Sequence, residues 1–153
     1  MLGWFKRKPV AFFSAEEKQL IVTAIQKAEQ RTSGEVRIYV ESHCTYVDPV
    51  MRAREVFAAL NMGDTAARNG VLVYVAMKDR QLAIYGDEGI HAKVGNAFWN
   101  EEVQKMLSDF NSQNYASGIA KIIGEIGEAL VQHFPYNRTT DTNELPDDIV
   151  FGK

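Results

Sequence analysis

Two apolar runs joined by a short polar connection decide the fold: Gly70-Val71-Leu72-Val73-Tyr74-Val75-Ala76-Met77, then Lys78-Asp79-Arg80, then Gln81-Leu82-Ala83-Ile84-Tyr85. The first run is almost wholly apolar and rich in β-formers, which is typical of a strand that is covered on both faces. Because the polar connection is so short, the two runs predict an antiparallel hairpin. A strand buried on both faces predicts that this hairpin lies at the centre of a sheet with helices around it.

The residues before the hairpin predict a helix, a strand and a second helix. Apolar residues recur at helical intervals over 14–32, and Ser14 and Glu17 have the spacing of a capping box. Residues 35–41 alternate polar and apolar side chains, which indicates the first strand. A second helix is expected from Pro49, which suits a first helical turn. Because that helix connects two strands as a crossover, the first and second strands should be parallel and the sheet mixed.

The residues after the hairpin predict a glycine-bearing loop and two more helices. The loop is expected over 86–95, the third helix from Phe98 to Phe110, and the fourth over 115–134, where Pro135 closes it. One compact α/β domain over 14–134 with about four helices follows from these elements. The tail 1–13 precedes this domain, and the polar, acidic extension 135–153 is expected to be loosely held.

Composition and charge narrow the function classes. The net charge of −3 argues against a nucleic-acid partner, which would call for a basic face. Cys44 is the single cysteine, so an internal disulfide is excluded, and we treat this residue as structural. No apolar run is long enough for a transmembrane segment, and the residues 1–5 precede the basic residues 6–8, the wrong order for a secretory signal. Both observations favour a cytoplasmic protein. The aromatic and basic residues of 4–8 predict, as one alternative, peripheral contact with an anionic membrane; the other is that Phe12 and Phe13 pack against the first helix.

The predicted topology brings acidic and amide side chains together at one end of the sheet. The start of the second strand lies at the same end as the finish of the third, so Asp64 and Asn69 should meet Asp87 and Glu88. Their oxygen atoms are ligands that Ca²⁺ and Mg²⁺ prefer. We therefore predict a divalent-cation site here, with loops shaped by glycines that let backbone carbonyls turn toward it. Those loop-shaping glycines are Gly70, Gly86 and Gly89.

Each of these residues also has a plainer interpretation. Asp87-Glu88-Gly89 can form an ordinary turn, Asn69-Gly70 can be a strand entry, and Asp64 can cap a turn. Arg68 and His91 are peripheral candidates beside the cluster, and no histidine–carboxylate pairing can be inferred from their spacing. Glu41 and Asp48 belong to the opposite end of the sheet, where Asp48 is expected to cap the second helix.

Three blocks in this order resemble the TPM domain family: Thr32-Ser33-Gly34-Glu35-Val36-Arg37-Ile38-Tyr39-Val40, then Arg68-Asn69-Gly70-Val71-Leu72-Val73-Tyr74-Val75, then Leu82-Ala83-Ile84-Tyr85-Gly86-Asp87-Glu88-Gly89-Ile90. The resemblance covers about residues 14–134. It implies a three-layer α/β/α sandwich around a small mixed β-sheet, and a groove at one sheet end that binds calcium or related ions in some members. It maps onto Asn69-Gly70 and onto the turn at residues 86–89, which reads Gly-Asp-Glu-Gly where a glycine-aromatic-glycine-acid order is more familiar.

The resemblance leaves three functions open. The first is a divalent-cation-binding accessory or interaction domain that uses Ca²⁺ or Mg²⁺ to shape a docking surface for a protein partner or a membrane-associated complex. The second follows plant thylakoid-lumen members regarded as acid phosphatases: a metal-dependent hydrolysis of phosphomonoesters, with Asp87 on the metal, Asp64 or Glu88 orienting water, and Arg68 as the evident cationic group. The third is a metal-free interaction module.

Overall fold

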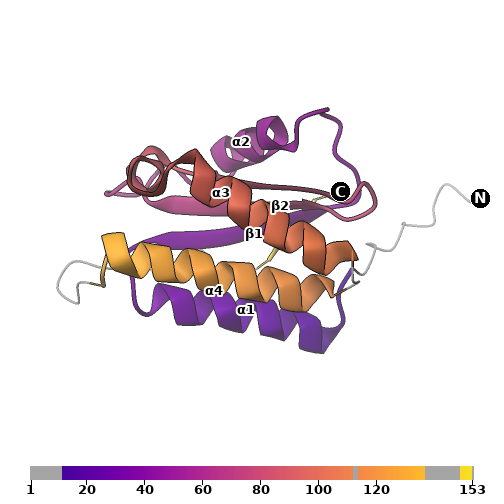
Figure 1. Cartoon of the computed structure of the whole chain (residues 1–153), viewed down its shortest axis with the longest axis horizontal. Helices are drawn as coiled ribbons and strands as arrows, with labels where there is room; N and C mark the ends of the chain where they lie inside the picture. Colours follow the sequence, from indigo (N-terminus) through magenta and orange to yellow (C-terminus); the bar gives the residue numbers. More distant parts are fainter. Residues whose placement is uncertain (1–11, 112–113, 137–148, 153) are drawn as a thin grey trace, which may run out of the picture.

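The computed structural model describes residues 12–111, 114–136 and 149–152, which form four helices and four strands (Figure 1). The helices are α1 (Ala15–Glu29), α2 (Pro49–Ala59), α3 (Glu88–Asn111) and α4 (Tyr115–His133). The strands are β1 (Glu35–Glu41), β2 (Gly70–Ala76), β3 (Gln81–Gly86) and β4 (Val150–Phe151). Residues 1–11, on which the predicted membrane contact depends, lie outside the described part of the chain.

The sheet has the mixed topology that the sequence predicts. Its strand order is β3-β2-β1-β4, with β1 parallel to β2 and β2 antiparallel to β3. Every residue of β2 is buried, as expected of a central strand covered on both faces.

Two apolar cores lie on the two faces of the sheet. On one face, α1, α3 and α4 pack over alternate residues of the strands, among them Val36, Ile38, Val71 and Val73. On the other face, α2 packs its Ala53, Val56 and Phe57 against the opposite residues of β2 and β3. Figure 1 shows the sheet between α2 above and the α1–α4 pair below, with α3 crossing in front of the strands above α4. The chain is therefore an α/β sandwich, as predicted.

Helix starts follow the caps that the sequence indicates. The hydroxyl of Ser14 accepts a hydrogen bond from the backbone N–H of Glu17 at 3.1 Å, and the Glu17 carboxylate accepts one from the N–H of Ser14 at 2.9 Å. The Asp48 carboxylate accepts the N–H of Val50 at 3.0 Å and begins α2. Phe13 is buried in the core with α1, as one of the two interpretations of this segment expects.

The predicted loop over 86–95 is wrong. Helix α3 begins at Glu88, and its single non-helical residue is Gly95, with φ 76° and ψ 171°. Gly89 lies in the first turn of α3 and its φ is not positive, so it does not shape a loop; glycine is needed there because there is no room for a side chain. Gly95 is the position where the backbone does need glycine, and it separates a short first helical stretch from the longer rest of α3.

The end of the chain is held more firmly than predicted. Residues 137–148 of the C-terminal extension lie outside the described part of the chain, but Val150 and Phe151 form β4 and pair in parallel with Tyr39 and Val40 of β1. Ile149 is buried in the core. A two-residue strand carries no alternation by which a sequence pattern could reveal it.

Candidate cation site at the Asp87 end of the sheet

The starts of β1 and β2 and the end of β3 lie at one end of the sheet, as the sequence predicts. Glu35 pairs with Gly70, and Val71 pairs with Gly86, so the first residues of β1 and β2 lie beside the end of β3. The backbone N–H of Asp87 donates to the carbonyl of Gly70 at 2.9 Å, and the N–H of Gly89 donates to the carbonyl of Arg68 at 2.8 Å. Two loops distant in sequence are thus joined here by main-chain hydrogen bonds.

Asp87 is buried and forms a bidentate ion pair with Arg68. The distances are 2.7 Å from Nε to Oδ2 and 2.9 Å from Nη2 to Oδ1, a geometry that suits the planar guanidinium. Oδ1 also accepts the backbone N–H of Glu88 at 2.8 Å, at the start of α3. Hydrogen bonds to Asp87 raise the pKa of the Arg68 guanidinium. Glu88 is exposed and lies 3.3 Å from Nη1 of Arg68, so one guanidinium serves two carboxylates.

Asn69 is buried beside this ion pair in the chain. Its Nδ2 donates to the hydroxyl of Ser33 at 3.2 Å, which ties the start of β2 to the residue before β1. Its Oδ1 has no hydrogen-bond partner within the described residues. Asp64 is exposed on the connection between α2 and β2, and its backbone N–H donates to the carbonyl of Asn61.

The three glycines at this sheet end allow close packing. A Cβ on Gly89 would lie 2.2 Å from the carbonyl oxygen of Ala67, one on Gly86 would lie 2.4 Å from the Trp99 ring, and one on Gly70 would lie 3.0 Å from the carbonyl oxygen of Met62. Gly89 therefore lets α3 begin in close contact with the backbone of Ala67 and Arg68.

His91 is partly buried in the first part of α3. Its Nδ1 accepts a hydrogen bond from the indole N–H of Trp99 at 3.0 Å, which leaves the proton of the neutral ring on Nε2. This bond links the two parts of α3 across Gly95. His91 therefore has a structural partner in place of a carboxylate.

At this end, Arg68 engages the carboxylates that a metal ion would need. Within residues 12–111, 114–136 and 149–152, no three or more His, Cys, Asp and Glu side chains are grouped so that they could hold a metal ion. Both Asp87 oxygens are engaged by Arg68, whereas the unpartnered Oδ1 of Asn69 is the kind of neutral oxygen ligand that Ca²⁺ accepts. The Arg68 side chain is 46% exposed, so this ion pair borders solvent.

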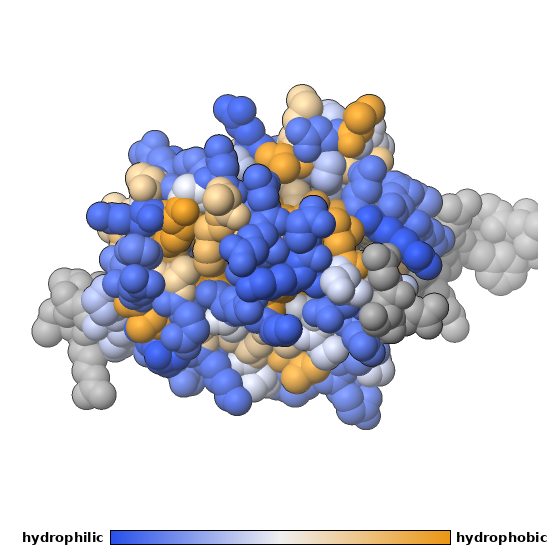
Figure 2. Space-filling view, viewed as in Figure 1, coloured by the Kyte–Doolittle hydropathy of each residue, from blue (hydrophilic) through white to orange (hydrophobic). Residues whose placement is uncertain are grey.

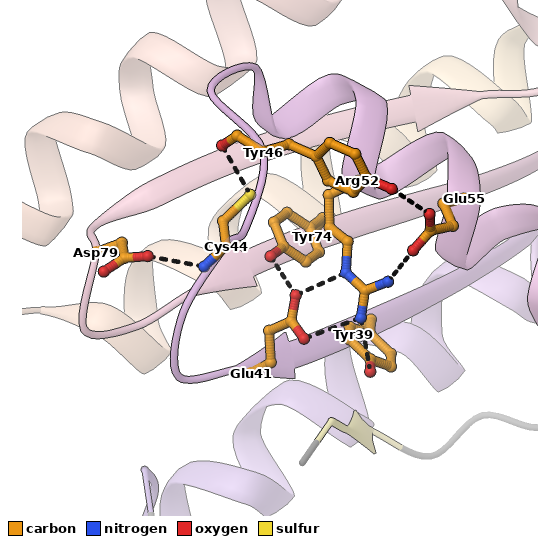
Figure 3. Close-up of polar contacts among 8 residues, drawn as sticks. All are labelled: Tyr39, Glu41, Cys44, Tyr46, Arg52, Glu55, Tyr74 and Asp79. Atoms are coloured by element: carbon orange, nitrogen blue, oxygen red, sulfur yellow. Dashed lines mark hydrogen bonds and ion pairs between the residues drawn. The ribbon is translucent and has the colours of Figure 1, made fainter.

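A second polar cluster, which no sequence pattern reveals, lies at the opposite end of the sheet and is centred on Glu41 (Figure 3). Its buried carboxylate binds Arg52 of α2 in bidentate fashion, with Nε to Oε2 at 2.9 Å and Nη2 to Oε1 at 3.0 Å. The fully buried Tyr74 also donates its hydroxyl proton to Glu41. These bonds raise the pKa of Arg52, and burial followed by the Glu41 hydrogen bond raises the pKa of Tyr74. The cluster joins β1, β2 and α2 through a satisfied buried charge.

The loop that covers this cluster is held by Asp79 in the β2–β3 turn. Asp79 accepts the backbone N–H of Cys44 at 2.7 Å, and its other oxygen lies 2.9 Å from Nδ1 of His43. Hydrogen bonds from His43 and Cys44 lower the pKa of Asp79. Cys44 is partly buried, and its thiol donates to the carbonyl of Tyr46, which agrees with a structural role.

A third polar group lies between α3 and α4. Glu102 is buried, its side chain 4% exposed, and Lys105 bridges it to Glu125 at 3.3 Å on each side. Burial, followed by the neighbouring Glu125, raises the pKa of Glu102 to about 7. Glu102 and Lys105, which hydrogen-bond to Glu125, lower the pKa of that carboxyl. One carboxyl of the pair therefore stays protonated into the neutral range.

This α/β sandwich matches the family model described as TPM domain over residues 7–129. The chain belongs to the TPM domain family. No curated protein matches it. Within the described residues, no helix combines the length and apolar character needed to cross a lipid bilayer.

Solved structures agree with this assignment. The NMR structure of the BA42 protein from the psychrophilic bacterium Bizionia argentinensis is 39% identical, with a TM-score of 0.85, over 96% of this chain and 100% of that one. The N-terminal domain of the cg2496 protein from Corynebacterium glutamicum is 15% identical, with a TM-score of 0.58, over 82% and 86% of the two chains. An N-terminal domain from P. gingivalis is 13% identical, with a TM-score of 0.65, over 83% of each. These last two show a shared fold.

Proposed function

We propose that this chain is a TPM-type accessory domain that binds a divalent cation, Ca²⁺ or Mg²⁺, at the Asp87 end of its sheet. The supporting observation is the charge balance around Arg68. Asp87 and Glu88 present two carboxylates to one guanidinium, which leaves one negative charge uncompensated. A divalent ion in place of the guanidinium would neutralise both carboxylates, and the unpartnered Oδ1 of Asn69 would add a neutral oxygen ligand.

In this proposal Arg68 competes with the metal. Its guanidinium must leave a bidentate pair with a buried carboxylate before the ion binds, so the affinity of the native chain is weakened by that cost. Asp64 would contribute from the α2–β2 connection as an outer ligand or through water. Cation binding would then rearrange the surface formed by Arg68 and Glu88, which is the surface offered to a partner.

The substitution Arg68→Met tests the proposal by removing the competitor. Without cation, the variant should unfold at a lower temperature than the native chain, because buried Asp87 loses its partner. With millimolar CaCl₂ or MgCl₂, its melting temperature should rise further than that of the native chain, because binding stabilises only the folded state. Arg31→Met, at an exposed ion pair with Glu128 just after the end of α1, is the matched control.

The decisive comparison is with Asp87→Asn. This variant should show no cation-dependent shift of melting temperature at any of these concentrations. If Arg68→Met also shows none, or if Asp87→Asn responds as strongly as the native chain, the proposed site is wrong.

The phosphatase alternative gains less support from the geometry. Arg68, the cationic group to which the phosphate would bind, is engaged by both Asp87 and Glu88. Hydrolysis of a phosphomonoester by the native chain and by Asp87→Asn, measured side by side with CaCl₂ and MgCl₂, tests this alternative. A metal-dependent rate that Asp87→Asn abolishes would favour it over the accessory function.

A further inference from the structure

Strand β4 occupies an acceptor edge that the N-terminal third of the chain builds. Val150 pairs with Tyr39, Phe151 pairs with Val40, and the N–H of Gly152 donates to the carbonyl of Val40 at 2.7 Å. β1 is the acceptor strand, and β4 is added to it in parallel as the last strand of the sheet. This is the geometry by which extended peptides bind to open sheet edges in other proteins.

The acceptor edge selects side chains as well as backbone. The side chain of Ile149 is buried in the core. The ring of Phe151 lies 6.5 Å from the ring of Phe13, and Nζ of Lys18 lies 5.6 Å from its centroid. A Cβ on Gly152 would lie 2.3 Å from the hydroxyl oxygen of Tyr39 and 2.9 Å from Cβ of Glu41, so a larger residue here would have to displace both side chains. The edge therefore accepts an aliphatic residue, an aromatic residue two positions later, and then glycine.

Nothing in this recognition requires the bound segment to belong to the same molecule. The contacts of Phe151 and Gly152 come from Phe13, Lys18, Tyr39 and Val40, and residues 137–148 separate β4 from Tyr136. Only two residue pairs form the ladder, and Phe151 is 41% exposed. The chain's own segment is favoured over the same segment of another molecule because it is tethered. The tether holds it near the edge at an effective concentration in roughly the millimolar range.

We propose that the outer edge of β1 is a docking site for the C-terminal segment of a second copy of this chain, so that two molecules can exchange residues 149–152 reciprocally. The second copy is the occupant because its segment carries the sequence that the edge fits. Such an exchange preserves every contact of β4 and is a low-cost route to a symmetric dimer. The proposal is independent of the cation site, which lies at the opposite edge of the sheet, where β3 ends.

The length of the tether provides a test. Pro135 bridges to Thr32 before β1, whereas β4 pairs at Tyr39, seven residues further along, or about 23 Å at the rise of a strand. Residues 137–148 can span about 40 Å when extended, which is ample. A chain lacking residues 137–146 keeps only Asp147 and Asp148 as a connection, which spans about 11 Å between Tyr136 and Ile149. In that variant the segment cannot reach its own edge.

The experiment measures the mass of the 137–146 deletion variant by light scattering after size-exclusion chromatography, from about 10 μM to 1 mM. The expected result is a dimer over this range, whereas the same deletion with Ile149→Asp and Gly152→Val should be a monomer. A folded monomer at 1 mM would overturn the proposal, and so would a dimer that survives the two added substitutions.

A second measurement applies if the deletion variant does not fold. Full-length Gly152→Val, labelled with ¹⁵N, is titrated with an unlabelled peptide of residues 145–153 of the native sequence. The peptide should shift the amide signals of Tyr39 and Val40 in this variant and should shift them less in the native chain, whose edge is occupied. Absence of these shifts in the variant would overturn the proposal.

Discussion

At the scale of single residues, the Asp87 end of the sheet is defined by a glycine that permits a close approach and an arginine that satisfies a buried charge. Gly89 lets the backbone of α3 start against Ala67 and Arg68, and Arg68 then reaches Asp87. The residue types at these positions were evident in the sequence, but their roles were not. In the sequence, a glycine beside acidic residues suggests a turn. Only the structure shows that Gly89 is needed because the backbone of residues 67–68 packs closely against it.

Gly89→Ala should destabilise the fold. Its Cβ would lie 2.2 Å from the carbonyl oxygen of Ala67, a main-chain atom that cannot turn aside as a side chain can. We expect a loss of about 2–3 kcal/mol in the free energy of unfolding, measured by urea denaturation. Gly124→Ala is the matched control, since a Cβ there has no neighbour within 4 Å and should stabilise α4 by up to about 1 kcal/mol. Equal effects at the two sites would contradict this account of Gly89.

Arg52→Met should be the most damaging change at the opposite end of the sheet. It leaves Glu41, whose side chain is 8% exposed, as a buried charge without its cation, at a cost of about 3–5 kcal/mol. Urea denaturation at pH 7 measures the loss. Arg54→Met, at an exposed position of the same helix, should change the free energy of unfolding by less than about 0.5 kcal/mol. A small loss in Arg52→Met would mean that Tyr74 alone satisfies Glu41.

At the scale of elements, the regular helices and strands could be predicted, and the irregular ones could not. The buried run of β2 and the hairpin to β3 gave clear patterns, and the crossover through α2 implied that β1 and β2 are parallel. The start of α3 at Glu88 was missed because two glycines within eight residues resemble a loop. β4 was missed because its position depends on a long-range contact with β1, which no local pattern records.

The contact between α3 and α4 should depend on pH through Glu102. The folded state holds a proton on this carboxyl up to a pKa of about 7, whereas the unfolded chain loses it near the ordinary value of 4.5. Because the folded state binds more protons between these values, the free energy of unfolding should fall as pH rises from about 4.5 to 7. The limit is about 3 kcal/mol, and the lowered pKa of Glu125 offsets part of it.

Glu102→Gln isolates this effect because glutamine stays neutral at every pH. Urea denaturation at pH 4.5 and pH 8 should give similar free energies of unfolding for the two chains at the lower pH and a more stable variant, by about 1–3 kcal/mol, at the higher pH. Parallel pH profiles of the variant and the native chain would show that Glu102 does not retain its proton.

At the scale of the whole molecule, the sandwich places one polar cluster at each end of its sheet and exposes three apolar side chains beside the Glu41 end. Val47, Val50 and Met51, beside the Glu41 end, are 98%, 46% and 58% exposed. Figure 2 shows hydrophilic residues over most of the viewed face, with hydrophobic ones in scattered patches, some of them along the upper edge near α2. The third function, a metal-free interaction module, stays a prediction for which these residues are a starting point.

The sequence correctly predicted that the start of β2 and the end of β3 lie at the same end of the sheet, because strand direction alone determines which loops meet. It did not reveal that Arg68 binds both Asp87 and Glu88. These residues are far from Arg68 in the sequence, so their ion pairs depend on how α3 packs against the residues before β2. The fold could therefore be predicted almost completely, whereas the state of the site could not. The cation proposal depends on whether a divalent ion displaces that arginine.

Titration of the ¹⁵N-labelled native chain with CaCl₂, and separately with MgCl₂, followed by two-dimensional NMR, tests the cation proposal most directly. The account predicts saturable shifts of the amide signals of Arg68, Asn69, Asp87 and Glu88, with no comparable shifts at Glu41, Cys44 and Asp79 at the other end of the sheet. Amide signals at residues 68–69 and 87–88 that stay in place up to 20 mM of either salt, or that move no more than those of the Glu41 end, would contradict it.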